Sequence, residues 1–231
     1  MDRYSEITDK QKREIVLLRG KGCAYKKCLF CDYHHDCLDD ENENFKLNKS
    51  VLDKITGKFG EVEIINSGSV FELDAKTLDY IKKVCRDKGV HTIHFEAHYL
   101  YDNRIPALRE DFKGFTLKMK LGLETFDFEL REGVYKKGIP VREPEIISKN
   151  FDEANFLFGL EGQSLESMRR DIELGLGYFE RICINIMCGN STPVKPDKSV
   201  IAEFMQELYP KYKDDLRVDI LVNNTDFGVG E

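Results

Sequence analysis

Short apolar runs alternate with helix-like segments along most of the chain, and this alternation is the main structural signal. The runs predict strands at residues 14–18, 62–65, 91–96, 115–122, 155–160 and 181–186, with a last strand at 218–222. Helical spacing follows at residues 73–88 and 197–208, and Ser164 caps a further predicted helix. The pattern therefore predicts a repeated strand-helix unit.

Six strands that alternate with helices imply parallel pairing through right-handed crossovers. We therefore expect an α/β fold, a partial (β/α)6 TIM-like barrel that the run at 218–222 completes or edges. No linker rich in Gly, Ser or Pro interrupts the pattern. One domain is expected over residues 1–231, with its core at about 14–197 and a C-terminal extension at about 198–231.

Ligands in such folds bind at the carboxyl ends of the strands. Residues at these ends are the cysteine-rich loop after the first strand, 66–69, Glu96 with His98, Glu124, 161–163 and 185–192. Many are polar or glycine where the preceding residues are apolar. This change of character is typical of loops around a pocket.

The charge balance points to a small substrate. The 231 residues contain 42 acidic and 35 basic side chains, a formal charge of −7, so the positive surface of a general nucleic-acid binder is not expected. No run approaches the roughly 18 apolar residues of a membrane span. The first residues, MDRYSEITDKQKR, lack the apolar segment of a signal peptide, so a cytoplasmic protein without a membrane partner is expected.

Four of the seven cysteines crowd into one loop, in which Cys23, Cys28 and Cys31 have the spacing C-x4-C-x2-C and Cys37 follows. Three thiolates on a short loop can hold a soft metal centre. A structural zinc site would need a fourth ligand, from His34, His35 or Cys37. A plant-type ferredoxin site would need Cys85. The third interpretation is a [4Fe-4S] cluster with three cysteine ligands and one open iron.

The third interpretation resembles the radical S-adenosylmethionine (SAM) superfamily, whose usual spacing is C-x3-C-x2-C with an aromatic residue before the last cysteine. Phe30 fills that place here, while the first interval is one residue longer. The resemblance implies that Cys23, Cys28 and Cys31 ligate the cluster and that SAM binds its open iron. It also implies 5′-deoxyadenosyl radical chemistry and an external electron donor such as flavodoxin or ferredoxin.

The same resemblance implies a SAM site. Members of the superfamily bind the methionyl amino group at a Gly-Gly-Glu-like turn after the second strand, and this chain has Ser67-Gly68-Ser69 there, without the carboxylate. Glu124 is expected on the ribose or methionyl part of SAM, and Lys137 on its carboxylate. Phe30 is expected to contact adenine chiefly through its backbone.

For the substrate, the resemblance implies a small nucleobase-like molecule, because the chain has no appended domain for tRNA or protein. We expect a lyase that releases the 7-aminomethyl-7-deazaguanine base from queuine. Candidate polar contacts are Glu96, His98, Glu161, Asn185 and Asn223. The alternatives are another radical SAM reaction on a different small molecule, and a non-catalytic iron-sulfur protein that transfers electrons or regulates.

Overall fold

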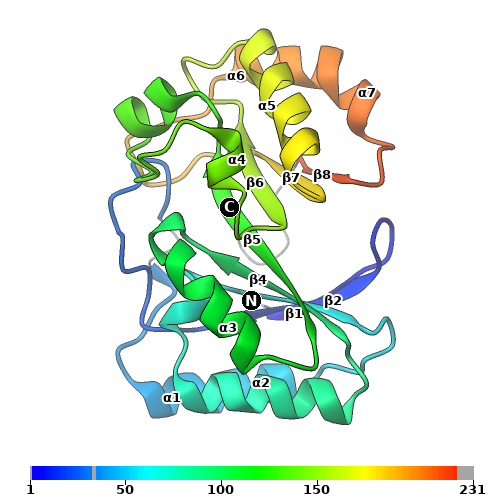
Figure 1. The fold of residues 1–231 in the computed structure, drawn as a ribbon. Helices are drawn as coiled ribbons and strands as arrows, with labels where there is room; N and C mark the ends of the chain where they lie inside the picture. Colours follow the sequence, from blue (N-terminus) through cyan, green and yellow to red (C-terminus); the bar gives the residue numbers. More distant parts are fainter. Residues whose placement is uncertain (1, 33–34, 223–231) are drawn as a thin grey trace. The chain divides into compact units, whose positions relative to one another are not determined.

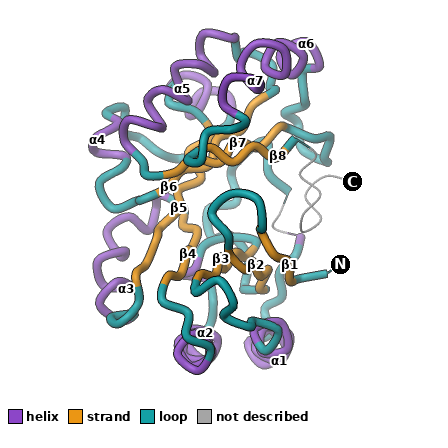
Figure 2. Tube along the Cα trace, turned by 90° about the vertical axis from the view of Figure 1, so that its right-hand side faces the viewer, coloured by secondary structure: helices purple, strands orange, loops and turns teal. Residues whose placement is uncertain are grey.

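A computed structural model describes residues 2–32 and 35–222, and this part of the chain contains eight strands, which alternate with helices from β2 onward (Figure 1; Figure 2). The chain folds into two compact units. Unit 1 comprises Met1–Lys26 and Tyr33–Met119, and unit 2 comprises Lys27–Asp32 and Lys120–Glu231. The cysteine loop is therefore divided, because Cys23 belongs to unit 1 while Cys28 and Cys31 belong to unit 2.

Unit 1 is built on strands in the order β1-β2-β3-β4. The strands β2, β3 and β4 pair in parallel, whereas β1 is antiparallel to β2. Helices α1 and α2 lie on the same face of this sheet (Figure 1). The bounds are β1 Tyr4–Ile7, β2 Arg13–Leu18, α1 Glu41–Leu52, β3 Glu61–Asn66, α2 Ala75–Asp87, β4 Thr92–Ala97 and α3 Ile105–Asp111.

All six residues of β2 are buried, including two charged ones. The Nε of Arg13 donates to Glu63 of β3 at 2.5 Å. The Glu14 carboxylate accepts from the backbone nitrogens of Thr56 and Gly57, both at 2.7 Å. Because buried charges cost free energy unless they are paired or hydrogen bonded, these contacts fix the start of β2 and leave its apolar residues to form the core.

Unit 2 contains the strands β5-β6-β7-β8 in that order, all parallel. Helices α5, α6 and α7 cover one face of β6, β7 and β8, as Figures 1 and 2 both show. The strand β5 begins in unit 1 and ends in unit 2. The bounds are β5 Thr116–Glu124, α4 Pro144–Ile147, β6 Glu153–Phe158, α5 Leu165–Tyr178, β7 Arg181–Ile186, α6 Lys198–Glu203, α7 Tyr209–Tyr212 and β8 Val218–Leu221.

The predicted strands are all present, and the run at 181–186 coincides with β7. The predicted cap of α5 is confirmed, since Ser164 Oγ accepts from the Ser167 nitrogen at 3.1 Å. The α/β class is confirmed, and so is the parallel pairing of the predicted strands within each unit, β2 to β4 and β5 to β8. One domain over residues 1–231 stays a prediction.

Three features differ from the sequence-based expectation. The antiparallel β1 was not expected, because its residues are only partly buried and show no apolar run. Helix α1 was not expected either, since two of its buried positions are the polar residues Asn44 and Asn48. The segment after β5 is helical only in short pieces, a π-helical turn at Glu129–Val134 and the four-residue α4, rather than one continuous helix.

Two glycines of α5 give a matched test of packing in unit 2. A Cβ on Gly175 would lie 2.9 Å from both Ile182 Cγ2 and Phe156 Cε2, whereas one on Gly177 would meet nothing within 4 Å. We expect Gly175→Ala to lower the free energy of unfolding by about 1–2 kcal/mol, because overpacking outweighs the gain in helix propensity. Gly177→Ala should raise it by up to about 1 kcal/mol. Urea unfolding of both variants measures this, and equal stabilities would contradict the packing.

Candidate functional site

The first part of the cysteine loop leaves the end of β2 in unit 1 through a glycine turn. Gly22 has φ +89°, and a Cβ there would lie 2.9 Å from the Cys37 Cβ. Glycine is therefore required both by the backbone conformation and by the space. Cys23 follows directly as a free, partly exposed thiol.

The predicted SAM turn follows β3. Ser69 is buried, and its Oγ accepts from the backbone nitrogen of His98 at 2.9 Å. Ser67 Oγ donates to Asp36 at 3.2 Å, while Gly68 carries no side chain and is partly exposed. Both serine hydroxyls thus have protein partners, and the turn is held in one conformation.

A carboxylate that the sequence reasoning missed lies at this turn. Glu72 accepts from the backbone nitrogen of Ser69 at 2.6 Å and from that of Ala24 at 2.7 Å. The hydroxyl of Tyr101 donates to it at 3.0 Å. The signal was available, because Ser69-Val-Phe-Glu72 has the S-x-x-E sequence of a capping box. The Ser67–Ser69 turn itself has no carboxylate, but the carboxylate of Glu72, three residues after Ser69, is hydrogen bonded to it.

The two predicted substrate residues near the end of β4 differ in exposure. His98 is buried; its Nδ1 accepts from the Leu100 nitrogen at 3.0 Å, and its ring stacks on Tyr25 with centroids 4.5 Å apart. Glu96 is partly exposed. His98 therefore also supports the cysteine loop, because Tyr25 lies two residues after Cys23.

The second part of the cysteine loop belongs to unit 2 and is anchored by its aromatic residue. Phe30 is buried with Tyr135, and the thiols Cys28 and Cys31 pack against this cluster. The Phe30 and Tyr135 rings meet edge to face at 5.9 Å. The Phe30 carbonyl accepts from Asn190 Nδ2 at 2.7 Å.

The loop after β7 holds the same segment. The backbone nitrogen and hydroxyl of Ser191 both donate to Asp32, at 3.1 and 3.0 Å, and the Val194 nitrogen donates to the Leu29 carbonyl at 3.2 Å. Sequence reasoning placed residues 185–192 at the ligand edge, but it did not foresee that Asn190 and Ser191 bind the cysteine loop. No sequence signal indicates these pairings, since the partners lie about 160 residues apart.

Two predicted SAM residues, Glu124 and Lys137, are brought together in unit 2. Lys137 Nζ lies 2.8 Å from Glu124 Oε1, and both side chains are only 10% exposed. Burial alone would lower the pKa of Lys137, but Glu124 and the nearby Cys28 and Cys31 raise it above its usual value. The ammonium therefore stays charged close to both thiols. It also lies 5.6 Å above the centre of the Phe30 ring.

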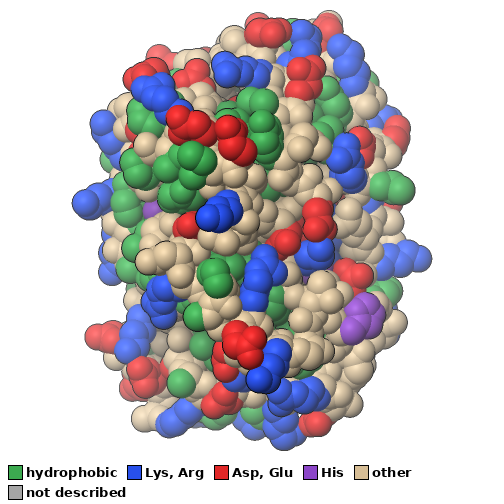
Figure 3. Space-filling view, viewed as in Figure 1, with side chains coloured by type: hydrophobic (Ala, Val, Ile, Leu, Met, Phe, Trp, Pro, Cys, Tyr) green, Lys and Arg blue, Asp and Glu red, His purple; other side chains and the backbone are tan. Residues whose placement is uncertain are grey.

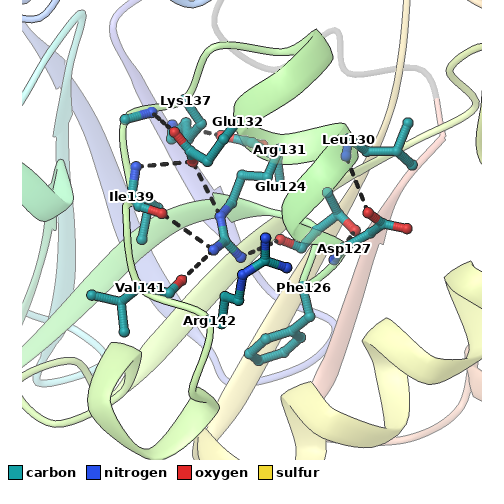
Figure 4. A network of polar contacts seen from close by, with 12 residues as sticks. Glu124, Phe126, Asp127, Leu130, Arg131, Glu132, Lys137, Ile139, Val141 and Arg142 are labelled. Atoms are coloured by element: carbon teal, nitrogen blue, oxygen red, sulfur yellow. Dashed lines mark hydrogen bonds and ion pairs between the residues drawn. The ribbon is translucent and has the colours of Figure 1, made fainter.

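The turn that carries Lys137 is fixed by the buried Arg131 (Figure 4). The Arg131 guanidinium donates to the carbonyls of Thr125, Ile139 and Val141. Glu132 accepts from the backbone nitrogens of Gly138 and Ile139, at 2.8 and 2.9 Å. These bonds close the loop from residue 125 to residue 141 around the segment that bears Lys137.

The remaining predicted substrate residues are placed as follows. Glu161 is exposed, and Asn185 is partly exposed, with its Nδ2 3.5 Å from the Phe156 carbonyl. Asn223 lies outside the described residues. Their contacts with substrate stay predictions. On the face drawn in Figure 3, acidic and basic side chains are interspersed.

The cysteines suit an iron-sulfur cluster by their chemistry. Within residues 2–32 and 35–222, no disulfide involves Cys23, Cys28 or Cys31, which are all partly exposed, whereas Cys85 is fully buried. Burial, with a smaller contribution from Glu14, raises the pKa of the Cys85 thiol to about 12, which does not suit the fourth ligand of a ferredoxin site. Among the described residues no three Cys, His, Asp or Glu side chains are grouped around one point as metal ligands. The fit therefore rests on the three thiols and on the cation beside two of them.

Comparisons with known proteins define the class. The chain is similar over its full length to a solved structure of queuine lyase from Clostridium spiroforme bound to SAM and queuine, with 45% identity, a TM-score of 0.95 and 100% of each chain covered. No protein-family model and no curated protein sequence matches the chain.

Two more distant structures share the fold. A radical SAM methyltransferase from Sphaerobacter thermophilus is 12% identical with a TM-score of 0.61, over 100% of this chain and 80% of the other. Streptococcus suis SuiB bound to S-adenosylmethionine is 16% identical with a TM-score of 0.51, over 90% of this chain and 46% of the other. At these identities the likeness concerns the fold alone.

The chain belongs to the radical SAM superfamily, whose members use a [4Fe-4S] cluster and SAM, as the cysteine loop predicts. Within the superfamily it is of the queuine lyase type, to which it is 45% identical over its whole length. The predicted α/β fold class of the radical SAM type is confirmed by the same similarity. Within the described residues, no helix is long and apolar enough to cross a membrane.

A buried acid beneath the end of β5 gives a test by pH. Asp171 Oδ1 accepts from the Phe126 nitrogen at 2.7 Å, and its Oδ2 has no hydrogen-bond partner among the described residues. Burial raises the pKa of Asp171 to about 7. The folded protein therefore holds a proton that the unfolded chain releases near pH 4.

We expect stability to fall as the pH rises from about 4 to about 7, by up to about 4 kcal/mol from this group. Asp171→Asn keeps the acceptor for Phe126 and removes the titration. Urea unfolding at pH 5 and pH 8 should therefore show a larger loss for the natural protein than for the variant. Parallel pH dependences would contradict a proton on Asp171.

Proposed function

We propose that the chain is a radical SAM lyase that cleaves queuine and releases the 7-aminomethyl-7-deazaguanine base. The observation that carries the proposal is the full-length similarity to a queuine lyase bound to SAM and queuine, at a TM-score of 0.95. The cysteines of the loop, none of which is in a disulfide in the described part of the chain, and the buried Glu124–Lys137 pair support it. The substrate is accordingly a small molecule.

Three thiols, Cys23, Cys28 and Cys31, would hold the cluster. When bound, the cluster and SAM supply a 5′-deoxyadenosyl radical that abstracts hydrogen from the substrate. The protein supplies charge and orientation. Lys137, whose pKa is raised above its usual value, places a positive charge beside Cys28 and Cys31.

The SAM site proposed from the sequence keeps its residues: Phe30, Ser67, Gly68, Ser69, Glu124 and Lys137. In unit 2, Glu124 and Lys137 form a pre-paired couple of opposite charges, which suits a zwitterionic methionyl group, because each charge can pair with one end of it. The candidate substrate contacts are Glu96, His98, Glu161, Asn185 and Asn223. An external donor such as flavodoxin or ferredoxin, and a cytoplasmic location, stay predictions.

Queuine-dependent turnover tests the proposed function. Anaerobic protein with a reconstituted cluster, dithionite and SAM should form 5′-deoxyadenosine and the aminomethyl base when queuine is added, both quantified by mass spectrometry. Guanine in place of queuine is the control, and it should yield neither the base nor stimulated 5′-deoxyadenosine. If queuine gives no product while SAM still binds, the substrate is wrong and a different radical SAM reaction must be sought.

Iron content tests the ligand set. Cys23→Ala, Cys28→Ala or Cys31→Ala should each abolish stable cluster binding, since each removes one iron ligand. The control is Cys85→Ala, which changes a buried thiol of α2 and should leave about four irons per chain. Iron and sulfide analysis after anaerobic reconstitution measures both. Equal iron loss from Cys85→Ala would reject these three ligands.

A further inference from the structure

Glu72 in unit 1 binds three segments of the chain at once. Its Oε1 accepts from the Ala24 nitrogen and from the Tyr101 hydroxyl, and its Oε2 accepts from the Ser69 nitrogen. Ala24 is the residue after Cys23, and Ser69 ends the predicted SAM turn. One carboxylate therefore joins the backbone of the cysteine loop to the backbone of that turn.

The main chain of Glu72 binds the same loop from the other side. The Lys21 nitrogen lies 3.4 Å from the Glu72 carbonyl, and a Cβ on Gly20 would lie 2.8 Å from this oxygen. The loop from Gly20 to Ala24 is thus tied at both ends to a single residue. A loop segment with two such ties loses much of its conformational freedom.

The packing around Gly68 shows how closely the two backbones approach. A Cβ on Gly68 would overlap Glu72 Oε2 and would lie 3.3 Å from the Cys23 Cα. Glycine at this position therefore lets the SAM turn contact both the carboxylate and the cysteine backbone. A side chain at position 68 would push the turn away from the Glu72 carboxylate and from the Cys23 backbone.

Within the part of the chain that the structure describes, the Glu72 carboxylate is held by hydrogen bonds rather than by an ion pair. Among the described residues it has no ion-pair partner, and it is only partly exposed, so its charge is balanced by hydrogen bonds alone. Burial and then the Glu72 charge raise the pKa of Tyr101 to about 12, and Cys23 contributes to the same shift. Glu72, Tyr101 and Cys23 thus share one neighbourhood.

We propose that Glu72 is a positioning residue that fixes Cys23 and the Ser67–Ser69 turn as one rigid body, so that the cluster ligand and the SAM turn keep their relative position. The proposal rests on the proposed function, because it assumes a cluster on Cys23 and SAM at the turn. A carboxylate suits the task since it only accepts hydrogen bonds and can receive both N–H groups. The side-chain amide of a glutamine would instead turn its NH2 group, which is a donor, toward the N–H group of either Ala24 or Ser69.

The test compares Glu72→Gln with Tyr101→Phe in reconstituted protein. Glu72→Gln keeps the size of the side chain but leaves one backbone N–H facing a donor. Tyr101→Phe removes one hydroxyl and leaves both backbone bonds intact. We expect Glu72→Gln to keep about four irons per chain, to weaken SAM binding at least tenfold by calorimetry, and to reduce the SAM-induced shift of the reduced cluster's EPR spectrum. Tyr101→Phe should stay within twofold of the natural protein.

Unchanged SAM affinity and an unchanged EPR shift in Glu72→Gln would overturn the proposal, whatever happens to its thermal stability. If this variant fails to hold a cluster, Gly68→Ala replaces it, because the added methyl group displaces the same carboxylate without changing a charge. Unchanged SAM binding in Gly68→Ala would then overturn the proposal.

SAM binding is measured without queuine, so a natural protein that binds SAM but ignores queuine would refute the substrate and leave the test of Glu72 intact. A natural protein that binds no SAM would overturn both.

Discussion

Buried ion pairs join neighbouring parallel strands in both units, and the compensation of these charges constrains the strand arrangement. In unit 2, Arg181 of β7 pairs with Glu153 of β6 at 2.5 Å and with Asp219 of β8 at 2.7 Å. In unit 1, Arg13 of β2 pairs with Glu63 of β3 at 2.5 Å. A shift of register by one residue would turn these charges away from their partners, at a cost of about 3–5 kcal/mol for each broken buried pair.

A buried ion pair also lies where β5 ends, and there its residues, Glu124 and Lys137, belong to the candidate SAM site. Glu124 ends β5 with φ +72°, and the register of β5 on β6 shifts between Gly122 and Glu124. This irregularity and the left-handed backbone are strained for a glutamate, and the ion pair with Lys137 offsets the strain. Arg131 supports the arrangement by holding the loop that carries Lys137. The structure therefore stores strain at a residue expected to bind SAM.

The strands could be predicted from sequence because a buried parallel strand shows itself as an apolar run, as in β3 and β7. The cysteine loop could be predicted because three thiols lie within nine residues of the chain. The role of Glu72 follows a local capping pattern, which was visible but did not indicate a contact with Ala24, 48 residues away. Asn190 binds the Phe30 carbonyl across 160 residues, and no local pattern contains such a contact.

These contacts give a physical account of the unusual spacing of the cysteines. Cys23 lies in a segment held by Glu72 in unit 1, whereas Cys28 and Cys31 lie in a segment held by Tyr135 and Asn190 in unit 2. Between the first two cysteines, Ala24 is bound by Glu72, and Lys26, two residues further on, has φ +51°. A left-handed residue reverses the local direction of the chain, so an additional residue can be absorbed there without moving either anchor. The longer C-x4-C interval is thus compatible with a ligand loop whose two ends are fixed independently.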